Sequence, residues 1–161
     1  ESRIAPGGSV PLRSRTRIEA YDVAHTAGTE TVGVMVAVED GEPLKSAYRK
    51  FKVRGFANND SGALAEIVSR RLVHPEWTYP RVVVVDGGVA QMNAVRRILA
   101  HSGIEIPVVG VVKDDRHRPK RLKGNSTIIQ AHERDILLAN SEAHRFAVTW
   151  HRKRLAKASL D

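Results

Sequence analysis

The sequence predicts an α/β fold in which a mixed five-stranded sheet is flanked by helices. Three strand-like segments come first, and two apolar strand-like runs then alternate with segments of helical periodicity. Strands that follow one another closely pair antiparallel, whereas strands joined through a helix run parallel. We therefore expect three antiparallel strands followed by parallel ones, in one domain of the size that 161 residues allow.

The first three strands are predicted at residues 17–25, 31–39 and 44–53. The first two show the alternation or apolar continuity of strands, and Asp40-Gly41 is typical of a tight hairpin turn between the second and the third. The third strand carries positive charge at Lys45, Arg49, Lys50 and Lys52.

The apolar run at residues 81–85 predicts a central strand. Its four consecutive valines need burial on both faces, as in a parallel sheet covered by helices on each side. Before it, a helix is predicted from the polar segment 58–61 to His74-Pro75, and after it a second helix spans about 89–101. The run ends at Asp86, which places that carboxylate where open α/β sheets bind their ligands.

The last third of the chain predicts a buried strand at 107–112, a short strand at 127–130 and a final helix. This helix is expected from about Glu133 to Ser159, with a break at Asn140-Ser141. Its residues Ala143, Phe146, Ala147 and Trp150 form one apolar stripe that suits packing on the sheet.

Composition narrows the classes of function. Residues 1–16 are rich in Pro, Gly, Ser and Arg and are expected to be a flexible tail or linker remnant, which leaves 17–161 as the folded domain. The chain has no cysteine, and no apolar run approaches the roughly 20 residues that span a bilayer, so we expect a cytoplasmic protein that does not bind membranes. The net charge of +8 favours nucleic acid as a partner, although a merely soluble basic surface would have the same charge.

Two carboxylates are the candidate metal ligands. If the valine strand lies parallel to the first strand, Asp22 and Asp86 are neighbours at the middle of the sheet. Adjacent carboxylates repel each other unless a cation lies between them, and hard oxygen ligands favour Mg²⁺ or Mn²⁺. Such an ion polarises a phosphoryl oxygen and activates water. The alternative is that Asp22 pairs with a lysine while Asp86 caps the helix that contains Gln91.

The final helix offers a third candidate. His144 lies in its more apolar part, where an imidazole could reach the carboxyl edge of the sheet, whereas His151 lies among basic residues. A single histidine on a helix is more often structural than a ligand, so the residues alone leave the role of His144 open.

Several short segments, taken in order, carry a family resemblance. Tyr21-Asp-Val-Ala-His-Thr26, Tyr48-Arg-Lys-Phe51, Val85-Asp-Gly-Gly88 with Gln91 and Asn93, and Glu142-Ala-His-Arg-Phe-Ala147 follow one another along the chain. These short motifs and their order resemble those of the C-terminal endonuclease domain of the UvrC excinuclease subunit, over about residues 17–161. Two positions depart from the pattern that this family commonly has: Ala24 stands in place of Ser, and Ser141 in place of Asp.

The resemblance implies an RNase H-like fold and divalent-metal-dependent hydrolysis of DNA on the 5′ side of a lesion in nucleotide excision repair. It implies that Asp22, Asp86 and His144 are the catalytic and metal-ligating residues, with Mg²⁺ or Mn²⁺ as the cofactor. Its implied partners are damaged double-stranded DNA and the damage-recognition protein UvrB. Matching positions around this centre are supporting rather than ligating: His25, Gln91, Asn93 and Lys113.

Basic residues are the candidate contacts to the DNA backbone. They gather in the segment 113–123 and near the end of the final helix, where they would position DNA without reading its sequence. The set is Arg116, Arg118, Lys120, Arg121, Lys123, Arg145, Arg152, Lys153 and Arg154. Two other functions stay open: a non-catalytic nucleic-acid-binding module on the same fold, and an RNA-directed nuclease.

Overall fold

The computed structural model describes residues 16–26, 30–55, 59–114, 116 and 119–160, with side chains in the last helix described as far as residue 149. Apart from Thr16, the predicted tail lies outside the described residues. Among the described residues, no helix combines the length and the apolar character that crossing a membrane requires.

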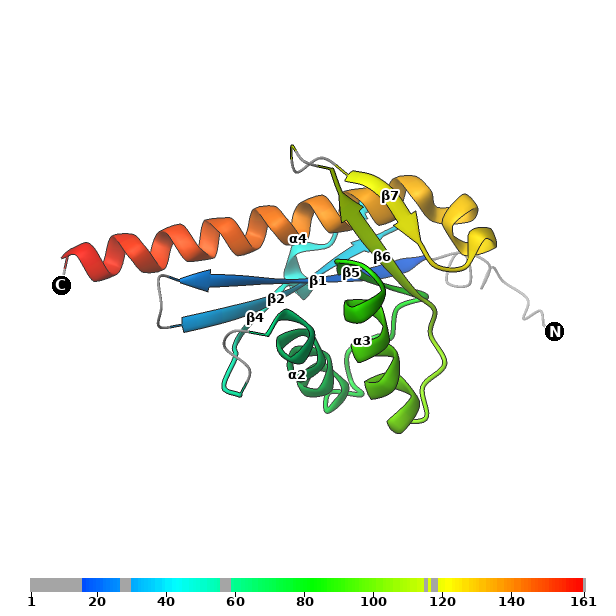
Figure 1. Cartoon of the computed structure of the whole chain (residues 1–161), viewed down its shortest axis with the longest axis horizontal. Helices are drawn as coiled ribbons and strands as arrows, with labels where there is room; N and C mark the ends of the chain where they lie inside the picture. The colour runs from blue at the N-terminus through cyan, green and yellow to red at the C-terminus, as the bar shows by residue number, and fades with distance from the viewer. Residues whose placement is uncertain (1–15, 27–29, 56–58, 115, 117–118, 161) are drawn as a thin grey trace, which may run out of the picture.

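One mixed sheet forms the centre of the domain (Figure 1). β1 pairs antiparallel with β2 and parallel with β5, and β5 pairs parallel with β6. The strand order is β3-β2-β1-β5-β6-β7, and β4 also pairs with β2. The strands are β1 Arg17–Thr26, β2 Glu30–Glu39, β3 Glu42–Pro43, β4 Arg49–Lys52, β5 Val82–Asp86, β6 Val108–Lys113 and β7 Pro119–Lys123.

The predicted number of five strands is wrong, since seven lie in the described part of the chain. The expected third strand is split into β3 and β4 by a 3-10 turn, η1 Lys45–Ala47. The second half of the basic segment 113–123, for which no strand was predicted, forms β7, which pairs antiparallel with β6. The predicted antiparallel and parallel relations of the other strands are confirmed.

Local turn chemistry explains how β2 and β3 connect. Asp40 and Gly41 have φ values of 52° and 83°, which is the positive-φ pair that a type I′ hairpin requires. Glu39 and Glu42 then face each other in the antiparallel register, as the Asp40-Gly41 signal predicted.

Helices cover both faces of the sheet. α2 (Asp60–Leu72) and α3 (Val89–His101) pack on one face, and the long α4 (Ser126–Leu160) crosses the other (Figure 1). The Asn59 side chain accepts a hydrogen bond from the Gly62 amide and caps α2, as the polar segment predicted. Gly103, with φ of 71°, follows the end of α3.

The start and the continuity of α4 differ from the prediction. The segment 127–130, expected to be a strand, is helical, because Asn125 accepts a hydrogen bond from the Ile128 amide and starts the helix there. The irregular residue is His132 (φ −131°, ψ 18°), and the helix passes through Asn140-Ser141 without the expected break.

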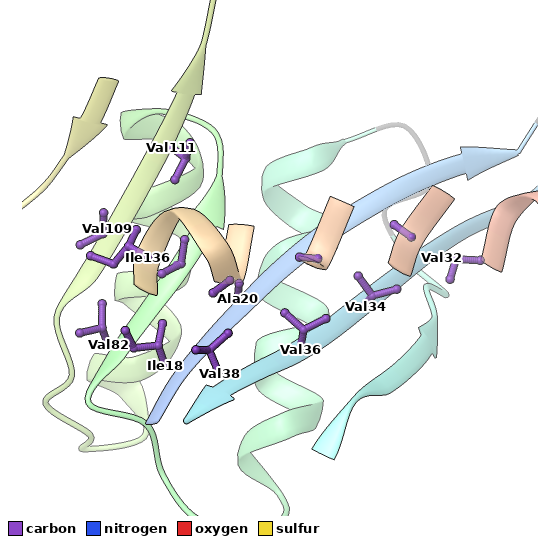
Figure 2. Packing of buried hydrophobic residues seen from close by; sticks show 14 residues of the cluster. Ile18, Ala20, Val32, Val34, Val36, Val38, Val82, Val109, Val111 and Ile136 are labelled. Atoms are coloured by element: carbon purple, nitrogen blue, oxygen red, sulfur yellow. The ribbon is translucent and has the colours of Figure 1, made fainter. Parts of the chain in front are cut away.

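The apolar side chains form a core on each face. Under α4 lie Ile18 and Ala20 of β1, alternate valines of β2, and Val82 of β5, in contact with Ile136 and the small residues of α4 (Figure 2). The intervening residues of the same strands pack under α2 and α3. Since strand residues alternate in direction, even-numbered residues of β1 and β5 face α4.

Candidate active site

Two aspartates lie side by side on β1 and β5, just beyond the last residue pair that joins these parallel strands. Tyr21 of β1 is paired with Val85 of β5, and the next residue in each strand is Asp22 and Asp86 respectively. Both follow the even-numbered alternation, so both carboxylates face α4. The predicted side-by-side placement of the two strands is therefore confirmed.

Asp22 is a largely buried acid. Its side chain is 9% exposed, and its Oδ1 accepts a hydrogen bond from the Val23 amide at 2.7 Å. Burial raises the pKa of the Asp22 carboxyl, a hydrogen bond from His144 lowers it in part, and the neighbouring Asp86 raises it further. An ionised Asp22 thus needs positive charge nearby.

Asp86 has two donors on one oxygen. Lys113 Nζ and, at 3.3 Å, Asn140 Nδ2 both contact Asp86 Oδ1. Lys113 comes from the end of β6 and Asn140 from α4, so three elements meet at this carboxylate. Asp86 does not cap α3: that role belongs to Gln91, whose Oε1 accepts a hydrogen bond from the Gly88 amide at 3.1 Å. The alternative of a lysine pair is realised, but at Asp86 rather than at Asp22.

His144 reaches the same edge from α4. Its Nδ1 lies 3.4 Å from Asp22 Oδ2, and its side chain is 59% exposed. The hydrogen bond to Asp22 raises the pKa of the His144 imidazole above its usual value. With Nδ1 directed at Asp22, the Nε2 edge is the one that solvent or a substrate can reach.

The donor set at this edge fits a hard divalent cation. Two carboxylates and an imidazole come from β1, β5 and α4, and among the described residues the buried Asp22 has His144, not a lysine or an arginine, as its ion-pair partner. In the described part of the chain they are not already gathered as a set of three ligands around one point. Lys113 instead neutralises Asp86, so ion binding would require Lys113 to shift.

The hydrogen bonds shown for the three other supporting side chains do not involve the two carboxylates, and that of Gln91 is the one to the Gly88 amide. His25 bonds Thr31 Oγ1 through Nδ1 at 3.0 Å and Asp60 Oδ1 through Nε2 at 2.7 Å, which ties β1 to the start of α2. Asn93 accepts a hydrogen bond from Arg96 within α3. Of the four predicted supporting residues, the structure brings only Lys113 to the carboxylates.

The predicted backbone-contacting residues are dispersed. Arg116 is exposed, and Arg145 forms two hydrogen bonds to Glu142 at 2.9 and 3.0 Å. Because Leu122 packs in the core under α4, strand alternation places Arg121 and Lys123 on the opposite face. Arg118 lies outside the described residues, as do the side chains of Lys120, Arg152, Lys153 and Arg154.

Sequence reasoning missed Asn140. The sequence predicts a helix break at this residue, but its side chain is buried and contacts both Asp86 and Lys113. One signal could have found it: Asn140 precedes His144 by four residues, so the two share a helix face.

A comparison with known families matches residues 10–148 to the model described as the UvrC RNAse H endonuclease domain. Two curated relatives are both named UvrABC system protein C. The one from Lachnospira eligens is 36% identical over 95% of this chain and 28% of the relative, and the one from Caldicellulosiruptor saccharolyticus is 39% identical over 90% and 26%. The chain therefore spans about a quarter of the length of these relatives. These matches confirm the resemblance and its RNase H-like fold.

Solved structures show weaker likeness. The catalytic domain of human Endonuclease V has a TM-score of 0.46 at 18% identity, covering 63% of this chain and 46% of that one. Endonuclease V of Ciona intestinalis, in complex with a DNA containing an inosine, has a TM-score of 0.47 at 16% identity, covering 76% and 56%. Neither likeness bears on substrate or mechanism.

Proposed function

The chain belongs to the UvrC RNase H endonuclease domain family, and on that premise we propose that it is a divalent-metal-dependent DNA endonuclease of nucleotide excision repair. The cut lies on the 5′ side of a lesion in double-stranded DNA, and the domain acts together with UvrB. Mg²⁺ or Mn²⁺ is the cofactor.

One observation carries this proposal: Asp22 of β1 and Asp86 of β5 directly follow the paired residues Tyr21 and Val85, and His144 of α4 lies beside Asp22. A purely structural role would not require two neighbouring carboxylates on the same face of the sheet. A cation between them offsets their repulsion, and the burial of Asp22 strengthens that need.

Asp22 and Asp86 would hold the ion, with His144 either as a third ligand or as the base for the attacking water. When bound, the ion polarises the scissile phosphate and lowers the pKa of water for in-line attack. Asp22 also holds the His144 ring through Nδ1, so that Nε2 is the nitrogen that can take a proton from water. The products carry a 3′-hydroxyl and a 5′-phosphate.

Basic residues would hold the DNA through its phosphates. The candidates include Arg116 at the β6–β7 turn and the basic end of α4. The test neutralises three residues at this end of α4 together: Arg152, Lys153 and Arg154. The change should weaken binding to DNA of any sequence and reduce the dependence of the affinity on salt. Fluorescence anisotropy over a salt series measures both quantities, and an unchanged salt slope would show that this end of α4 does not contact DNA.

Plasmid nicking with and without Mg²⁺ or Mn²⁺ tests the activity. Asp86→Ala and the near-isosteric Asp86→Asn should both reduce nicking to the level seen in EDTA, while Glu133→Ala, an exposed acid on α4, should leave it unchanged. Thermal denaturation confirms that each variant is folded. Full nicking by folded Asp86→Asn would refute the assignment, and cleavage of RNA in preference to DNA would refute the substrate.

A further inference from the structure

Asn140, Lys113 and Asp86 form a closed ring of hydrogen bonds. Lys113 Nζ contacts Asp86 Oδ1 and lies 3.4 Å from Asn140 Oδ1, while Asn140 Nδ2 donates to the same Asp86 oxygen at 3.3 Å. The amide of Asn140 thus binds both members of the ion pair. It accepts from the lysine and donates to the aspartate, which fixes their relative positions.

Asn140 is a polar side chain buried on a helix face that is otherwise apolar, and burying it costs free energy. Asn140 is 2% exposed, whereas the other buried positions in the part of α4 whose side chains are described are apolar: Ile136, Ala139, Ala143 and Ala147. A buried amide is unfavourable unless its polar atoms are hydrogen-bonded. The partners shown for the Asn140 side chain are both at the candidate active site.

Lys113 occupies the position that a cation would take on Asp86. Its side chain is 19% exposed and that of Asp86 is 28% exposed, so water screens the pair only partly. Without positive charge there, Asp86 would repel Asp22 across the neighbouring strand.

We propose that Asn140 is a positioning residue that holds the Lys113 ammonium on Asp86, so that Lys113 serves as an internal cation until a divalent ion displaces it. This inference rests on the proposed function, since it assumes that the ion binds at Asp86. Once displaced, the ammonium remains near the site on its flexible stem and can donate to a phosphate oxygen of the DNA.

Binding of Mn²⁺ alone, measured from the electron paramagnetic resonance signal of the free ion, provides the test. Lys113→Met removes the competing ammonium and should tighten Mn²⁺ binding on the order of tenfold, as loss of a close charge–charge contact implies. Arg97→Met removes the same charge from an exposed position on α3, on the other face of the sheet, and should change affinity much less. In EDTA, Lys113→Met should also lower the melting midpoint, and saturating Mn²⁺ should remove that difference.

Asn140→Leu separates positioning from charge, because it keeps the net charge and removes only the amide. It should tighten Mn²⁺ binding in the wild-type background and have little effect in the Lys113→Met background, since Asn140 acts through the lysine. Asn140→Ala replaces it if the leucine variant does not fold.

Equal effects of Asn140→Leu in both backgrounds would overturn the positioning role. Unchanged or weaker Mn²⁺ binding by Lys113→Met would overturn the role of the lysine as an internal cation. Asp86→Asn distinguishes these failures from that of the proposed function: if it binds Mn²⁺ as well as the wild type does, the metal site itself is wrongly placed.

Discussion

Asp22→Asn should stabilise the metal-free protein although it destroys the proposed metal site. Asp22 is buried, and burial together with Asp86 disfavours its ionised form. The asparagine keeps an oxygen for the Val23 amide and presents a neutral amide to His144. The substitution therefore removes a repulsive charge and little packing.

The size of the effect follows from the sheet. Neighbouring strands lie about 4.8 Å apart, and two like charges at about 5 Å repel by about 3 kcal/mol at an effective dielectric constant near 20. Lys113 on Asp86 and the exposed His144 offset part of this repulsion. A net gain of about 1–2 kcal/mol remains, which corresponds to a rise of about 3–6 °C in the melting midpoint for a domain of this size.

Differential scanning calorimetry at neutral pH in EDTA, and again with Mg²⁺, measures the effect. The variant should melt higher than the wild type in EDTA, and Mg²⁺ should raise only the wild-type midpoint. Glu133→Gln, which neutralises an exposed acid on α4, should shift the midpoint by no more than about 2 °C. A lower midpoint for Asp22→Asn in EDTA, or an equal response of both proteins to Mg²⁺, would refute this account of Asp22.

Two further substitutions test contacts near the candidate site: the hydrogen bonds between Arg145 and Glu142 on α4, and the close packing of Gly110 against Gly87. The hydrogen bonds from Arg145 lower the pKa of Glu142 below its usual 4.5, so this stabilisation is complete above that value and is lost as pH falls through the lowered pKa. The stability difference between the wild type and Glu142→Gln should shrink in melting curves taken from about pH 6 to pH 3, and a constant difference would contradict the assignment. Gly110→Ala would place its Cβ 2.5 Å from the Gly87 carbonyl oxygen, and should cost about 2 kcal/mol in urea unfolding. Gly88→Ala, whose nearest neighbour would be 3.9 Å away, is the control, and an equal cost at both positions would contradict the packing described here.

The two carboxylates could be predicted from the sequence because the signals for β1 and β5 are strong and local. Four valines in succession require a strand buried on both faces, and that strand ends at Asp86. The parallel pairing of β1 and β5 then follows from the intervening helix, and it brings Asp22 alongside.

The surroundings of Asp86 could not be predicted in the same way, because they depend on where α4 lies over the sheet. Thr127-Ile128-Ile129 has the β-branched character of a strand, yet the Asn125 cap and contacts with the core make it helical. With the start of α4 misplaced and a break expected at Asn140, its side chain could not be aligned with Asp86. The contact between Lys113 and Asp86 is likewise tertiary.

The central claim is that Asp22 and Asp86 together hold a divalent cation, and a crystal soaked in Mn²⁺ tests it most directly. Anomalous scattering at a wavelength near the manganese edge locates the ion without reference to its ligands. We expect a peak coordinated by both carboxylates, with the Lys113 ammonium moved away from Asp86. A crystal of protein active in nicking that shows no manganese between Asp22 and Asp86, or shows it only elsewhere, would mean that these two carboxylates do not hold the ion.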